Sequence, residues 1–130
     1  MNLKNILFGN GDKNTEDGTE RLVPVKEIYG GVIALKNGKF KECVKYCDRA
    51  IERLCDRNEH PADTEAFYLK GVALTYLGAF DKAYDVLYRA AWNYTHRSAA
   101  LFELACIDCR NGDYPAALEK LSESIGLNKG

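Results

Sequence analysis

The feature of this 130-residue chain that most constrains its fold is a sequence pattern that recurs at a fixed spacing. Residues 64–97 and 98–127 align without a gap, so that Gly78 and Gly112 lie 34 positions apart. Residues 24–57 carry the same pattern at a spacing of 40, which implies a six-residue insertion before the next unit. Self-similarity at such a period is typical of repeat architectures, in which each unit is one supersecondary element.

Particular residue types recur at the same positions of the three units, counted from Pro24, Thr64 and Ser98 as position 1. Positions 8, 20 and 27 carry small residues, position 15 carries glycine and position 17 carries an aromatic residue. A glycine after about 14 residues ends a first helix, and small side chains let a second helix approach it closely. Each unit is therefore predicted to be a helical hairpin. In that order of positions the residues are Gly31, Cys43, Ala50, Gly38 and Phe40; Gly71, Ala83, Ala90, Gly78 and Phe80; and Ala105, Ala117, Ser124, Gly112 and Tyr114.

These units predict an all-α domain over residues 23–127, with hairpins at about 24–57, 64–97 and 98–127. Apolar residues make up 46% of the chain and charged residues 28%, a balance that suits one packed core with a solvated surface. Residues 1–22 have a short apolar start and then a polar, glycine-punctuated stretch, and we expect a mobile segment there. The alternative is a helical bundle without repeats.

The pattern resembles that of the tetratricopeptide repeat (TPR) family, whose 34-residue unit has small residues at positions 8 and 20 and alanine at 27. The resemblance covers residues 24–127, although Glu27 stands where an aromatic is usual and Lys70 where an apolar residue is usual. It implies a right-handed α–α superhelix, or solenoid, of three hairpins whose first helices line a concave groove. The closest matches, all in unit two, are Phe67, Gly71, Leu74, Phe80, Ala83, Leu87 and Ala90.

By the same resemblance, the groove residues are those at positions 2, 5, 9, 12 and 13 of each unit. An apolar, aromatic groove suits an amphipathic helix or an extended apolar peptide, with Tyr68, Tyr76 and Phe102 as anchors. We therefore expect a protein–protein interaction module that acts as an adaptor or scaffold. The main groove candidates are Ile28, Val32, Leu35, Lys36, Glu65, Tyr68, Val72, Tyr76, Phe102, Cys106 and Arg110.

One well-known TPR subfamily grips the terminal carboxylate of heat-shock chaperones with a clamp of Lys, Asn and Arg side chains. The matching positions here hold Ile28, Val32, Leu69, Ala99 and Glu103. None of these side chains donates a hydrogen bond to a carboxylate, and Glu103 would repel one. Chaperone-tail recognition of that type is not expected.

The alternative function is a regulatory or oligomerisation domain of a larger assembly. Repeat arrays usually need a capping element over the last apolar face, and only residues 126–130 follow the last predicted helix. Either that face pairs with another copy in a homodimer, or the chain is part of something larger; the candidates for self-association are Leu104, Leu118 and Ile125. A further candidate ligand is the apolar stripe in residues 1–8, which could dock in the groove.

No metal, cofactor or catalytic residue is expected. The pairs Cys43/Cys47 and Cys106/Cys109 supply too few ligands for a closed zinc site, and buried cysteines behave as small hydrophobes. An enzyme is the alternative of a different class, but His96 has no regularly spaced acid or nucleophile to form a triad.

Charge and composition narrow the partners and the compartment. Lys and Arg number 18 against 19 for Asp and Glu, so no strong field attracts nucleic acid or an anionic membrane. No apolar run approaches the roughly 20 residues of a transmembrane helix. Five cysteines, an odd number, favour reduced thiols over a secreted disulfide framework, and we expect a cytoplasmic protein with a protein or peptide partner.

Overall fold

The computed structural model describes residues 24–56 and 63–129, and in these residues the regular structure is helical with no strand. The all-α prediction is confirmed for this part of the chain. The predictions for residues 1–22, including docking of residues 1–8, and for the turn at 57–62 lie outside the described residues. The helices are α2 (Val25–Lys36), α3 (Phe40–Cys55), α4 (Glu65–Tyr76), α5 (Phe80–Ala90), α6 (Tyr94–Arg110) and α7 (Tyr114–Lys129).

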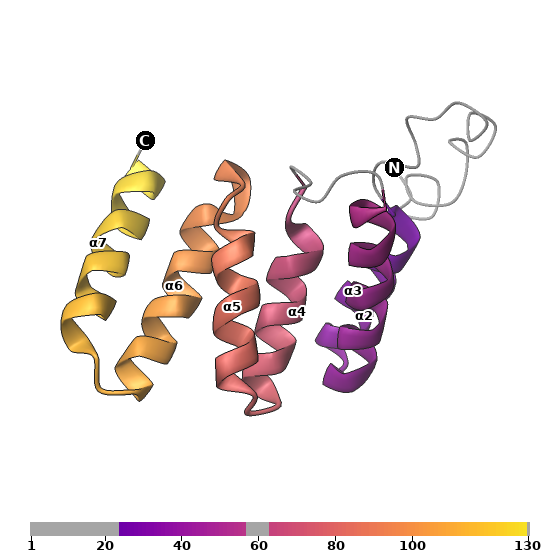
Figure 1. Ribbon diagram of the computed structural model, residues 1–130, viewed down its shortest axis with the longest axis horizontal. Helices are drawn as coiled ribbons and strands as arrows, with labels where there is room; N and C mark the ends of the chain where they lie inside the picture. Colours follow the sequence, from indigo (N-terminus) through magenta and orange to yellow (C-terminus); the bar gives the residue numbers. More distant parts are fainter. Residues whose placement is uncertain (1–23, 57–62, 130) are drawn as a thin grey trace.

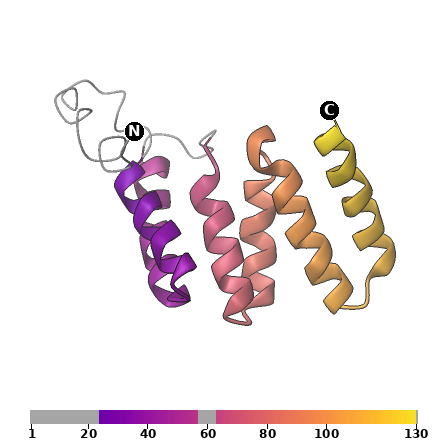
Figure 2. The same ribbon diagram turned by 180° about the vertical axis from the view of Figure 1, so that it is seen from behind.

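The six helices form a row in which each one packs against the next along the chain. The pair α2–α3 lies at one end of the row and α7 at the other (Figure 1). In Figure 1 α3 lies in front of α2, and in the reversed view of Figure 2 α2 lies in front of α3. The first helices of the units also contact one another, α2 with α4 and α4 with α6.

The glycine at position 15 ends the first helix of every unit, as predicted. Gly38, Gly78 and Gly112 have φ angles of 75°, 83° and 82°, and among the described residues only glycines have positive φ. The residue after each glycine donates its N–H to the carbonyl five residues earlier, for example Lys39 to Ala34 at 2.8 Å. This is the hydrogen bond of a Schellman motif, whose left-handed residue is most easily supplied by glycine.

Small residues allow the two helices of a unit to approach closely. A Cβ atom built on Gly71 would lie 2.5 Å from the Leu87 side chain, and one on Gly31 would lie 3.3 Å from the Cys47 sulfur. Leu87 is fully buried, and so are Cys43 and Cys47, whose sulfur atoms lie 4.0 Å apart. The prediction that these two cysteines belong to the core is confirmed.

Helix α6 begins earlier than the repeat pattern predicts. The pattern starts the third unit at residue 98, whereas the helix starts at Tyr94 and extends over 17 residues. The reason is a local cap: Asn93 has an extended backbone, and its side-chain oxygen accepts a hydrogen bond of 2.7 Å from the Thr95 N–H. An asparagine in this position satisfies a backbone donor at the helix end, so the helix starts at the cap rather than at the unit boundary.

Candidate interaction surface

The predicted groove residues all lie on the first helices α2, α4 and α6, but their exposure varies. Lys36, Tyr76, Phe102, Cys106 and Arg110 are exposed. The predicted residues that are half-buried are Val32, Leu35, Glu65, Tyr68 and Val72. We call these ten residues, together with Glu103, the first-helix surface.

Ile28, the remaining predicted groove residue, is a correction. Its side chain is buried in a core cluster that also contains Leu69 and Ala73 of α4. Because α4 packs against α2, the next first helix covers position 5 of unit one. Ile28 therefore contributes to the core and offers a ligand almost no contact area.

Two exposed residues of the first-helix surface are held in place by the preceding unit. Tyr76 stacks on Phe40, with ring centroids 4.7 Å apart and an interplanar angle of 5°. The guanidinium of Arg110 lies 4.1 Å from the centroid of the Phe80 ring. Position 13 of one unit thus covers the aromatic residue at position 17 of the unit before it. Stacking and cation–π contacts limit the rotamers of both side chains and leave their outer faces available.

Tyr68 on α4 and Glu103 on α6 are half-buried residues of the first-helix surface that lie near each other. Tyr68 is half-buried and packs against core residues of units two and three, and its ring stacks with His96 at a centroid distance of 6.3 Å. Burial, the nearby charge of Glu103 and the neighbouring Tyr76 all raise the pKa of Tyr68. Burial also raises the pKa of Glu103. The sequence does not predict this place for Glu103, because Tyr68 and Glu103 lie on different helices.

Cys106, which belongs to this surface, and Cys109, which lies one turn further along α6, are exposed free thiols. Burial raises the pKa of Cys106, and the charges of Glu103 and Cys109 raise it further. A thiol with a raised pKa is a poor nucleophile and a poor metal ligand at neutral pH, because both roles need the thiolate. Over residues 24–56 and 63–129, no group of three or more His, Cys, Asp or Glu side chains is arranged to hold a metal ion.

A small cavity lies away from the first-helix surface, beside α7. Its volume is about 250 Å³. None of the predicted groove residues lines it, so the cavity and the predicted groove are different places. Its walls are Tyr88, Ala91, Trp92, Arg97, Leu101, Ala116, Glu119, Lys120 and Glu123.

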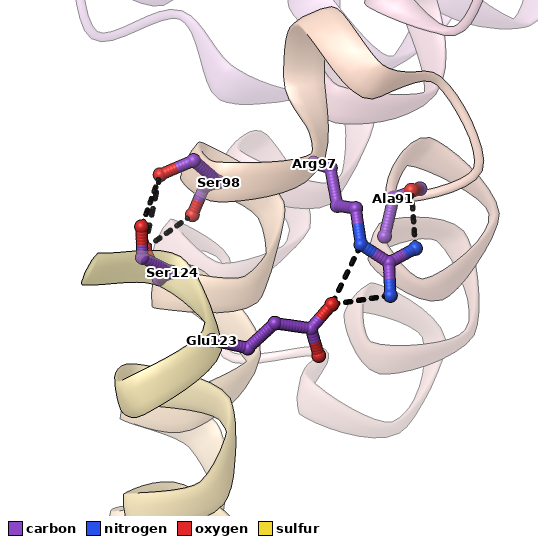
Figure 3. Close-up of polar contacts among 5 residues, drawn as sticks. All are labelled: Ala91, Arg97, Ser98, Glu123 and Ser124. Atoms are coloured by element: carbon purple, nitrogen blue, oxygen red, sulfur yellow. Dashed lines mark hydrogen bonds and ion pairs between the residues drawn. The ribbon is translucent and has the colours of Figure 1, made fainter. Parts of the chain in front are cut away.

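Polar contacts at this cavity hold α7 against α6 (Figure 3). Arg97 donates to the Glu123 carboxylate through Nε at 2.8 Å and to the Ala91 carbonyl at 3.2 Å. The Ser98 and Ser124 hydroxyls lie 3.0 Å apart, and the Ser98 hydroxyl also donates to the Ser124 carbonyl at 3.2 Å. These side chains link the start of unit three to its end.

A buried ion pair makes a second connection between α6 and α7. Lys120 Nζ lies 2.7 Å from Asp108 Oδ2, and the two side chains are 14% and 7% exposed. Burial by itself lowers the pKa of Lys120, but hydrogen bonds with Asp108 and Tyr84 outweigh it and raise the pKa above its usual value. The lysine is therefore charged, and its position depends on Asp108.

The three residues predicted for self-association divide into two groups. Leu118 and Ile125 lie on α7 and are 65% and 55% exposed. Leu104 is fully buried in a cluster with Leu74 and Leu87, so its assignment to an exposed face was wrong. The reason is its place on α6, which is covered by α5 on one side and by α7 on the other.

The chain matches no protein-family model. Among the residues that the structure describes, no helix combines the length and the apolar character needed to cross a membrane. The function must be inferred from the surface itself.

Proposed function

We propose that this chain is a three-repeat member of the TPR family, folded as a right-handed superhelix with the first helices on the concave side. Two features support the proposal. Each unit supplies two packed helices, joined by a turn with a glycine at positive φ. The first helices contact one another, whereas in the described part of the chain the second helices make no comparable contacts. Hairpins packed more closely on one side form a curved row.

We propose further that the first-helix surface binds an apolar or amphipathic segment of another protein, which makes the chain an adaptor or scaffold. The observation that carries this proposal is that the first helices expose two aromatic rings, Tyr76 (67%, stacked on Phe40) and Phe102 (50%), the second of them followed on α6 by the half-buried Glu103. Rigid aromatic rings beside a half-buried carboxylate offer a ligand apolar contact and one charge. A lysine or arginine in the bound segment would pair with Glu103.

The expected affinity is modest. Burying one large apolar side chain contributes about 1.5 to 3 kcal/mol, and association costs several kcal/mol of lost freedom. Two or three anchors therefore correspond to about micromolar binding. Such an affinity suits reversible assembly.

The proposal is for binding without catalysis, in the cytoplasm. The raised pKa of Cys106 disfavours its thiolate, which makes this thiol of the first-helix surface a poor nucleophile. The five cysteines are free thiols, which suits a reducing compartment.

Selection of random peptides on the immobilised protein, followed by calorimetric titration, tests the function. The selected sequences should combine aliphatic or aromatic residues with a basic residue. The variant Tyr76→Ala/Glu103→Gln should bind the selected peptides at least about tenfold more weakly, which corresponds to about 1.4 kcal/mol.

The matched control is Tyr88→Ala, since Tyr88 is also an exposed tyrosine but lies on the second helix α5. It should bind like the unaltered protein. Enrichment of no peptide, or equal binding by the first-helix variant, would rule out the proposed site.

A further inference from the structure

The joints between successive units use the same positions. Phe40, Val44 and Ile51 of α3 pack on a cluster that contains Ala66, Leu69 and Ala73 of α4. At the next joint, Phe80 and Tyr84 of α5 pack with Leu101, Leu104 and Ile107 of α6, while Ala91 packs with Ala100. A unit thus presents positions 17, 21 and 28, and the next unit covers them with residues that include positions 3 and 10.

The third unit presents the same positions to solvent. Tyr114, Leu118 and Ile125 stand at positions 17, 21 and 28 and are 61%, 65% and 55% exposed. Phe102, at position 5, is 50% exposed, whereas Ile28 at the same position of unit one is covered by α4. We call Phe102, Tyr114, Leu118 and Ile125 the end face. In units one and two, the residues at positions 17, 21 and 28 pack against the helices of the next unit.

The first unit carries the complementary half of a joint on α2. Ile33, at position 10, is 41% exposed, whereas Ala73 and Ile107 at position 10 of the later units are buried. Lys36, at position 13, is exposed, and it corresponds to Tyr76 and Arg110, which stack on Phe40 and Phe80. We call Lys26, Ile33 and Lys36 the start face.

We propose that the end face binds the start face of a second copy of this chain, head to tail, in the register of the internal joints. In that register Ile33 of one copy packs against Leu118 of the other, as Ile107 packs with Tyr84. Lys36 then lies over the Tyr114 ring, as Arg110 lies over Phe80. Because the start face carries a cation and the end face an electron-rich ring, a second copy of this chain fits the end face better than a purely apolar partner does.

The joint between copies is weaker than the internal ones for an identifiable reason. Position 3 is alanine at both internal joints, where Ala66 and Ala100 are fully buried, but it is Lys26 on the start face. Bringing an ammonium group to the edge of an apolar contact costs desolvation, so the assembly needs high protein concentration. A head-to-tail contact also does not stop at two copies, since each added copy offers a new end face.

The inference does not depend on peptide binding. Leu118 and Ile33 lie outside the first-helix surface, and the test leaves Phe102 and Lys36 unaltered because each belongs to the first-helix surface and to one of the two self-association faces. Loss of self-association with intact peptide binding, or the reverse, would therefore separate the two proposals.

The experiment is sedimentation of the whole chain over a concentration series, with the variants Ile33→Glu and Leu118→Glu alone and mixed. The unaltered protein should show an average mass that keeps rising with concentration. Each variant alone should be monomeric, and an equimolar mixture should form a 1:1 pair, because each variant retains one intact face. Lys26→Ala should strengthen association of the otherwise unaltered chain by about tenfold.

The matched control is Tyr88→Glu, an equally large change at an exposed residue of α5, which should associate like the unaltered chain. Circular dichroism confirms that each variant is folded. If the unaltered chain stays monomeric at all concentrations, the proposal is overturned. This holds even if a chain that lacks residues 1–23 does associate. Self-association of Ile33→Glu alone also overturns it, since that result indicates a symmetric contact between two end faces.

Discussion

Helices α5 and α7 occupy the same place in successive units, yet they are held by different forces. Helix α5 lies between α4 and α6 and buries Ala83, Leu87 and Ala90 completely. Helix α7 packs mainly on α6, and of its described side chains only Ala117 and Ser124 are buried. Its attachment relies on the Lys120–Asp108 ion pair and on the Ser98–Ser124 and Arg97–Glu123 contacts.

The difference teaches that identical hairpin geometry does not imply identical stabilisation. An inner second helix is stabilised by apolar burial on two sides, so its loss removes the core of the domain. The last second helix is stabilised on one side and largely by polar pairs, so it can separate while the rest stays folded.

The largest effect on stability is expected for the apolar contacts of α5. Leu87→Ala should lower the free energy of unfolding by about 4 kcal/mol, because it empties a fully buried site packed against Gly71. Urea denaturation followed by circular dichroism measures this change. The matched variant Leu118→Ala, on exposed α7, should alter stability by less than about 0.5 kcal/mol. Similar losses of stability in the two variants would contradict the different stabilisation of α5 and α7.

The second-largest effect on stability is expected for the polar contacts that attach α7. Asp108→Ala should cost about 3 kcal/mol, since it leaves the charge of Lys120 buried without its partner. Hydrogen exchange should show lost protection in α7 and retained protection in α3 and α4. The double variant Asp108→Ala/Lys120→Met removes both charges and should recover much of the loss. Uniform loss of protection across all helices would contradict the separate attachment of α7.

The smallest effect concerns Glu103, which lies on the helix that joins the two regions. Burial raises its pKa, so the folded state favours the protonated carboxyl. This contribution to stability is fully present below the pKa of the unfolded chain and is lost as the pH rises through the folded value. Glu103→Gln should therefore raise the urea midpoint slightly at pH 7 and leave it almost unchanged at pH 4. A larger gain at the acidic pH would show the opposite sign.

Features that depend on local backbone geometry could be predicted from the sequence. Gly38, Gly78 and Gly112 end helices because the turn requires positive φ, a requirement that the spacing of glycines reveals. The burial of Cys43 and Cys47 follows in the same way from their positions in the unit.

Features that depend on which neighbour covers a helix could not be predicted as well. The repeat pattern predicts open surfaces for Ile28 and Leu104, but an adjacent helix buries each of them. A repeat position fixes the side of the helix, whereas exposure also depends on what lies next in the row. Asn93 is a sequence signal for the early start of α6, since asparagine is a preferred cap, although the repeat pattern alone indicates a later start. The position of Glu103 near Tyr68 could not be predicted, because it depends on how α6 packs beside α4.

The buried thiols of α3 provide a way to measure how often the first hairpin opens. Contact with Cys43 and burial raise the pKa of Cys47, so it is inert to alkylating reagents while α3 stays packed on α4. Cys109, in contrast, is an exposed free thiol that a reagent can reach in the folded state. Fast labelling of Cys109 therefore serves as an internal reference, and the slow labelling of Cys43 and Cys47 measures how often the first hairpin opens.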